Sequence, residues 1–329
     1  MTDDERERAF KAALRKLTRG NTDLQRNTRD EIVRQLKAAL AKIEATLGAA
    51  PTDYQLWSLP RLMAEIRQVL NEFGDSAAAQ ISTAAGRAWQ LGADTVDTPF
   101  AAAGVGIRAV LPAISTRQLL AMRAFATDRI KDIAVQAMNK INTELGLVVI
   151  GAQAPGNAVG AVRNILGEPS RARATTIVRT SLGQVFSVAG FNRMQDAAAR
   201  VPGLQKQWRR SGKVHPRLHH FIADGQIRDV DKPFELRPLG QSPVHLMYPL
   251  DPKAPAGEVI NCGCVSLPYM AGWANLQNAL SQPGRSNAPV ADNLDAGPTM
   301  SELLDRQPAS APVARSTAST SRRSKEPQS

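Results

Sequence analysis

Cysteine, histidine and aromatic residues are scarce in this chain of 329 residues, which has two cysteines, four histidines and 5% aromatic residues. A disulfide between Cys262 and Cys264 would close a very small, strained ring, so the cysteines do not form the framework of a secreted domain. We expect free thiols or metal ligands in a reducing compartment. The few aromatics, beside plentiful Ala, Leu, Ile and Val, favour helices over a β-sandwich or barrel.

Long apolar runs are also missing. No stretch approaches the roughly 18 uncharged apolar residues of a membrane-spanning helix, and the start, MTDDERERAF, lacks the apolar core of a signal peptide. The chain has no Walker loop, dinucleotide fingerprint or paired-carboxylate signature. We therefore expect no membrane partner and no enzyme activity, in a protein kept in the cytoplasm or in an assembly built there.

Helical periodicity dominates the first 150 residues, where apolar side chains recur at spacings of three and four. We expect one helix to end at Gly20 and the next to begin at a capping box formed by Thr28 and Glu31. A third helix follows Pro51, residues 92–114 form an irregular connection, and the longest helix begins after Ser115. The predicted buried stripes are Ile32, Leu36, Leu40, Ile43 and Leu47; Leu59, Leu62, Ile66, Val69 or Leu70, and Phe73; and Leu119, Met122, Ala126, Ile130, Ile133, Ala137, Ile141 and Leu145.

The second half of the chain is more mixed. Residues 151–162 predict another connection, followed by a helix within 172–200. After Gly225 the runs QIRDVD, PFEL, VHLMYPL and VINCGCVSLPY alternate with Pro and Gly, which predicts short strands and turns. From about Ser281 the composition predicts a tail without fixed structure when free, in which MSELLDR is a candidate docking helix.

These patterns together predict an α+β fold that is mainly helical. We divide the chain into an elongated helical docking region at 1–154, an α+β module with short strands at 155–274, and a flexible polar and basic tail at 275–329.

The net charge of +11 favours a negatively charged partner, without choosing between nucleic acid, an anionic membrane and an acidic protein surface. Residues 171–220 carry ten basic side chains against Asp196 alone. Six of these are candidates for sequence-independent phosphate contacts with double-stranded DNA; the alternative is a solvated or protein-facing basic surface. Trp208 either stacks on bases or anchors the core. The six candidates are Arg171, Arg173, Arg179, Arg209, Arg210 and Lys213.

All four histidines lie within 31 consecutive positions, His215 to His245, and both cysteines follow shortly after. Cys262 and Cys264 can turn both thiolates to one side, because Gly263 allows a tight bend. With His220 they offer three ligands of the type that zinc takes, and His215 or Asp224 would complete four.

Three interpretations of this cluster stay open: buried thiols beside turn-binding histidines, a zinc site, or a cysteine nucleophile. A short helix beginning at Pro216 and ending at the Asp224–Gly225 pair would point His219 and His220 about 100° apart. We therefore expect the two histidines to serve different sites.

An ordered series of residues resembles the phage Mu F-like head morphogenesis, or minor head, proteins of tailed bacteriophages. The series covers roughly residues 160–270. It consists of Arg179-Thr180, Trp208, Arg217-x-x-His220, Asp224-Gly225, Pro249-x-Asp251-Pro252 and Asn261-Cys262-x-Cys264 with an apolar strand and Pro268. Two positions depart from the family pattern: Gly263 stands where a basic residue is common, and Ser181 where an acidic one is.

The resemblance implies a virion component that is added during prohead assembly near the portal vertex, and that contacts portal, major capsid or scaffolding proteins. In some members it implies association with packaged DNA or its delivery. The expected location is therefore the capsid interior or portal vertex, with the host cytoplasm during assembly. We take Trp208, Arg217, Asp224, Gly225 and Asn261 as the centre of the module.

Overall fold

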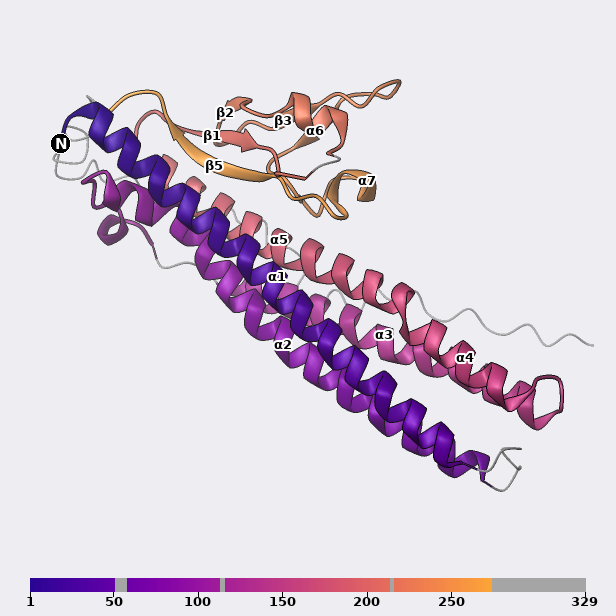
Figure 1. Cartoon of the computed structure of the whole chain (residues 1–329). Coiled ribbons are helices and arrows are strands. Elements are labelled where there is room, and N and C mark those ends of the chain that lie inside the picture. Colours follow the sequence, from indigo (N-terminus) through magenta and orange to yellow (C-terminus); the bar gives the residue numbers. More distant parts are fainter. Residues whose placement is uncertain (51–57, 113–115, 214–215, 274–329) are drawn as a thin grey trace, which may run out of the picture. The chain divides into compact units, whose positions relative to one another are not determined.

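The structure, a computed structural model, describes residues 1–50, 58–112, 116–213 and 216–273. The described residues belong to one compact unit, which is mainly helical and carries two small antiparallel sheets (Figure 1). The predicted α+β class is therefore confirmed. The domain boundaries at 154 and 274 remain predictions, and the tail with its MSELLDR segment lies outside the described residues.

The first helix is longer than the sequence pattern predicted. α1 runs unbroken over Asp3–Ala49, so the expected stop at Gly20 and the capping box at Thr28 are wrong. The capping box is at Thr2 and Glu5 instead, with Glu5 N donating to Thr2 Oγ1 at 3.3 Å and Thr2 N donating to Glu5 Oε2 at 2.8 Å. The buried stripe continues through polar side chains, which hid its continuity. From Phe10 to Ile32, the buried residues of this stripe are Phe10, Leu14, Asn21, Thr28 and Ile32.

α2, Leu59–Ala102, packs along α1. An irregular connection was expected at 92–114, and this expectation is wrong for residues 92–102, which belong to α2. Gly92 allows a close crossing with α5: a Cβ there would lie 2.3 Å from the carbonyl oxygen of Phe186. The helix continues past this glycine because the close packing of the two helix backbones offsets the low helix propensity of glycine. The 3₁₀ turn η1, Arg108–Val110, follows.

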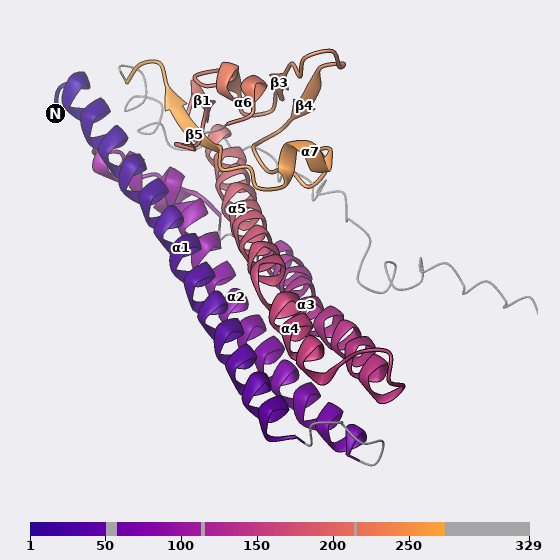
Figure 2. The ribbon, with the colours of Figure 1, turned by 45° about the vertical axis from the view of Figure 1, so that its right-hand side comes forward.

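Three more helices complete the helical part: α3, Arg117–Val149; α4, Pro155–Leu166; and α5, Glu168–Ala198 (Figure 2). The connection expected at 151–162 is wrong from residue 155 on, where a proline begins α4. The predicted stripes of the long helices are confirmed as core, with Leu40, Leu59 and Met122 partly buried. Of the two alternatives in the second stripe, Leu70 is buried and Val69 is partly buried. Helical period was thus a good guide to burial and a poorer guide to helix ends.

The strands form two small sheets. In the first, of order β2-β1-β5, the strands β1, Leu204–Arg209, β2, Ile227–Asp229, and β5, Val265–Met270, pair antiparallel. In the second, β3, Phe234–Leu236, pairs with β4, Val244–Leu246. The four strands expected after Gly225 are confirmed. The helices α6, Leu218–Ile222, and α7, Ala256–Val259, lie between strands.

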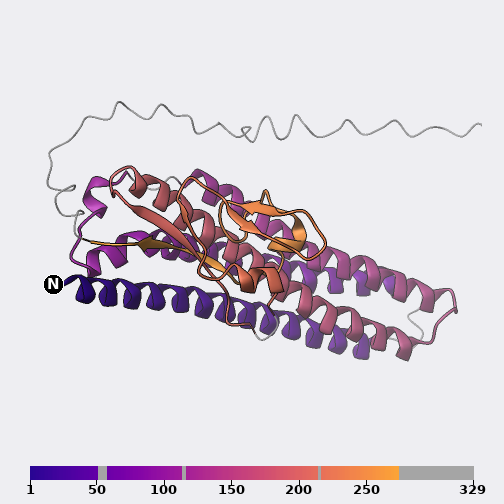
Figure 3. The ribbon, with the colours of Figure 1, turned by 90° about the horizontal axis from the view of Figure 1, so that it is seen from above.

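β1 was missed because it has a lysine at an inward position. Leu204, Lys206 and Trp208 alternate into the core, and Lys206 is fully buried. Its Nζ donates to the carbonyl oxygens of Val230 at 2.9 Å and Met247 at 2.7 Å. The sheet packs against α5, and Figure 3 shows β1 and β5 lying over the helices. No helix among the described residues is long and apolar enough to cross a membrane.

Candidate metal centre and basic cleft

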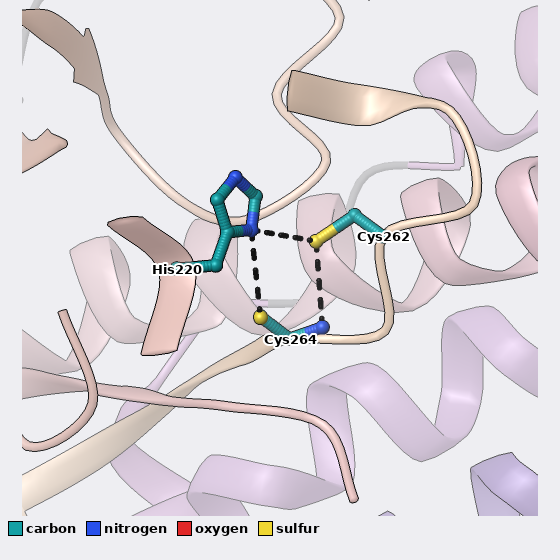
Figure 4. Close-up of side chains that lie close together, drawn as sticks. All are labelled: His220, Cys262 and Cys264. Carbon is teal, nitrogen blue, oxygen red and sulfur yellow. Dashed lines mark hydrogen bonds between the residues drawn. The ribbon is translucent and has the colours of Figure 1, made fainter. Parts of the chain in front are cut away.

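His220, Cys262 and Cys264 converge on one buried point (Figure 4). His220 comes from α6, and the cysteines come from the turn between α7 and β5. The Nδ1 atom of His220 lies 3.5 Å from Cys262 Sγ and 3.7 Å from Cys264 Sγ. All three residues are at most 6% exposed. The structure thus brings together the three residues that the sequence nominated as metal ligands.

The turn that carries the cysteines is shaped by its neighbours. Asn261 has a positive φ of 58°, and its backbone N–H donates to Thr180 Oγ1 at 3.1 Å on α5. A Cβ on Gly263 would lie 2.9 Å from the Cβ of Ser211, so glycine is needed for this close approach. The backbone N–H of Cys264 donates to Cys262 Sγ at 3.4 Å. The two sulfur atoms are therefore held on the same side of the turn.

Glu258 on α7 is a member of the site that the sequence analysis missed. Its Oε2 atom lies 2.7 Å from His219 Nε2 and 2.6 Å from His220 Nε2. The expectation that the two histidines serve different sites is wrong, because their rings, 4.8 Å apart between centroids, turn toward one carboxylate. Burial alone would raise the pKa of Glu258, but the hydrogen bonds from His220 and His219 lower it below its ordinary value.

The two thiols titrate as a pair. The hydrogen bond from Cys262 lowers the pKa of Cys264 to about 5, against the opposing effect of burial and with further help from His220. The same hydrogen bond, together with burial, raises the pKa of Cys262. The opposite shifts of the two pKa values therefore have a shared cause, the hydrogen bond between the two side chains.

The residues expected at the centre of the module lie around this site. Trp208 is fully buried, which makes it a core anchor, and its ring meets those of His220 and Phe234 edge-on at 5.5 and 5.4 Å. Arg217 Nη2 donates to the carbonyl oxygen of Ile260 at 2.8 Å. These contacts hold α6 against the turn that carries the cysteines.

Neither residue proposed as a fourth metal ligand completes the site within the part of the chain that the structure describes. Asp224 accepts a hydrogen bond from Arg210 N at 3.0 Å and does not belong to a described group of converging ligand atoms. His215 lies outside the described residues. Gly225, with a φ of 86°, forms the predicted turn after α6 and donates its N–H to Trp208 O at 2.9 Å.

A cleft of about 1030 Å³, here called the basic cleft, adjoins the two cysteines. Its wall includes seven basic side chains and one acidic side chain, Glu7. The basic ones are Lys11, Arg15, Arg19, Arg179, Arg209, Arg210 and Lys213. Four of the six predicted DNA-contacting residues are therefore part of one cleft. Arg171 and Arg173 are not among its lining residues and form ion pairs with Glu168 and Asp132.

Sequence reasoning missed the contribution of α1 to this cleft. Lys11, Arg15 and Arg19 recur every four residues, a spacing that puts them along one face of a helix. The signal was present in the sequence, but charges of both signs in the same segment concealed it.

Comparison with known proteins gives limited further information. One curated relative, the uncharacterized protein YqbB of Bacillus subtilis (strain 168), is 32% identical over 102 residues, which are 30% of this chain and 32% of YqbB. The match thus spans about a third of each protein. No family model matches the chain, and no solved structure matches it.

Proposed function

We propose that this protein is a minor head protein of a tailed bacteriophage, which acts in prohead assembly near the portal. The observation that supports the proposal is the convergence of a dispersed series of residues. Thr180, Trp208, His220, Asn261 and Cys264 are spread over more than 80 positions, yet they meet around the turn that carries the cysteines. This convergence supports a role of the series as one structural unit, as the resemblance implies.

The proposal assigns the module a structural role. The site fastens the turn before β5 to α5, because Asn261 donates to Thr180 and Thr176, and it fastens α6 to β1, because His220 packs on Trp208. The long helices would then dock to portal, major capsid or scaffolding proteins, inside the capsid or at the portal vertex.

The test is the composition of purified particles. Empty proheads and DNA-filled heads from the strain that encodes this chain would be analysed by quantitative mass spectrometry. We expect the chain in both particles, at a few copies for each portal ring. Deletion should leave major capsid protein production intact but yield defective heads, which plasmid-borne wild-type chain restores. Absence from both particles, with normal infectious heads after deletion, would refute the proposal.

A second candidate function, contact with packaged DNA, is favoured by the basic cleft. Arg19 and Arg179 have no ion-pair partner among the described residues, so their charge is available to an anion. Phosphate contacts release counterions, and the binding constant then falls steeply with salt.

The DNA proposal is tested with two charge-matched variants. Arg15→Glu, Arg19→Glu and Arg179→Glu together alter the cleft. Lys37→Glu, Arg67→Glu and Lys140→Glu change the net charge equally at exposed positions outside it. With a duplex of unrelated sequence, the first variant should weaken binding and flatten the log–log salt slope by about 0.9 for each lost contact. Equal loss in both variants, or no binding by the wild type, would contradict a cleft-specific role.

A further inference from the structure

We infer that His220 Nδ1, Cys262 Sγ and Cys264 Sγ bind one zinc ion, whose fourth ligand is a water molecule on the side of the basic cleft. The inference depends only on the geometry of the site and goes beyond the proposed role in head assembly.

The distances between the three atoms agree with tetrahedral zinc. Zinc bonds thiolate sulfur at about 2.3 Å and imidazole nitrogen at about 2.0–2.1 Å. At a tetrahedral angle these lengths put nitrogen and sulfur about 3.6 Å apart. The observed separations are 3.5 and 3.7 Å, and all three ligand atoms lie within 4.8 Å of one another. Both nitrogen–sulfur separations therefore agree with those that the ion requires.

The far side of the imidazole ring supports the same conclusion. A histidine that binds a metal through one nitrogen commonly donates its other N–H to a carboxylate, which fixes the tautomer. His220 does this with Glu258, at 2.6 Å from Nε2 to Oε2. In the tautomer that carries its proton on Nε2, the lone pair of Nδ1 faces the two sulfur atoms. Glu258 is a positioning residue, since it contacts the ring and not the ion.

The donor set selects the class of metal. Two thiolates and one imidazole are soft and borderline ligands that favour zinc over magnesium, calcium or manganese. Both cysteines and Gly263 belong to the wall of the basic cleft, and this cleft is the side from which a water molecule would reach the remaining tetrahedral position. Two thiolates offset the charge of Zn²⁺, so the ion leaves no uncompensated charge in this buried site.

The experiment measures metal in the purified full-length chain. After loading with zinc and removal of free metal, elemental analysis should find about one zinc per chain, and Cys262→Ser with Cys264→Ser should find none. Cobalt loading should give the thiolate-to-metal charge-transfer band of a tetrahedral site. His245→Ala, at an exposed histidine on β4, is the control and should retain both signals.

Glu258→Gln separates metal binding from folding. It keeps the shape of the side chain, so the helical circular dichroism should be unchanged, while zinc affinity measured against a chelating dye should fall about 10–100-fold. Removal of zinc by a chelator should also speed alkylation of the thiols. The inference is overturned if folded wild type binds no zinc and gives no cobalt–thiolate band, or if the double serine variant retains its zinc. These outcomes are independent of whether the chain is found in phage heads.

Discussion

The buried ion pair between Asp97 of α2 and Arg193 of α5 provides the sharpest stability prediction. Arg193 Nε lies 2.7 Å from Asp97 Oδ1 and Nη2 lies 2.8 Å from Oδ2, while Nη1 donates to Pro112 O at 2.7 Å. The two side chains are only 3% and 6% exposed. Removal of the Asp97 charge leaves buried Arg193 with Asp196 Oδ2, at 4.0 Å, as its remaining ion-pair partner among the described residues, and breaking a buried pair in this way costs about 3–5 kcal/mol. Asp97→Asn should lower the free energy of unfolding by an amount in that range.

The assay is urea unfolding monitored by circular dichroism. The slope of the free energy of unfolding against urea concentration should be the same in all variants, which checks that the unfolded state has not changed. The double variant Asp97→Leu with Arg193→Met removes both charges, so it should be less destabilised than Asp97→Asn. Glu65→Gln, in the exposed pair with Arg61, should cost less than about 0.5 kcal/mol. A loss below about 1 kcal/mol for Asp97→Asn, or additive losses in the double variant, would refute the reasoning.

Two further predictions concern packing and pH. Gly92→Ala should destabilise the protein by about 1–3 kcal/mol, because the new Cβ would meet Phe186 O at 2.3 Å. Gly146→Ala is the control: a Cβ there would have nothing within 4 Å, so this variant should be more stable by up to about 1 kcal/mol. Both free energies of unfolding are measured in urea, and equal effects of the two substitutions would contradict the close crossing of α2 and α5. Burial lowers the pKa of Lys206 from 10.5 to about 8, against the opposing charges of Asp231 and Asp251, so the folded state loses its proton before the unfolded state does. The free energy of unfolding of the wild type, relative to that of Lys206→Met, should therefore rise between pH 8 and 10.5, by at most about 1.4 kcal/mol per pH unit. If urea unfolding shows no change in this difference across that pH range, the lysine is not desolvated.

The sequence predicted the buried faces of the helices well and their ends less well. Burial follows from local spacing, so Ile32 and Ile130 could be assigned without tertiary information. Helix ends depend on what packs against the helix. Asn21 and Thr28 interrupt the apolar stripe of α1 but are buried in the unbroken helix, and Gly92 continues α2 because α5 crosses at that point.

The candidate site could be predicted only in part. Sequence proximity identified the thiols and His220, since few residue types bind soft metals. It could not identify Glu258, because nothing in the local sequence shows that this carboxylate meets the ring of His220. It also wrongly separated His219 from His220, since the direction of a Cα–Cβ bond does not fix where the end of a long side chain lies.

The sequence by itself determined the mainly helical α+β class, the apolar stripes and the set of residues able to bind a soft metal, because composition and local period carry that information. Only the tertiary structure decided that Arg193 is paired with Asp97, that Lys206 is buried, and that α1 supplies basic residues to the cleft beside Cys262 and Cys264. The physical reason is that burial and charge pairing depend on neighbours that are distant in the chain. Such neighbours are assigned by packing, and local sequence does not encode them.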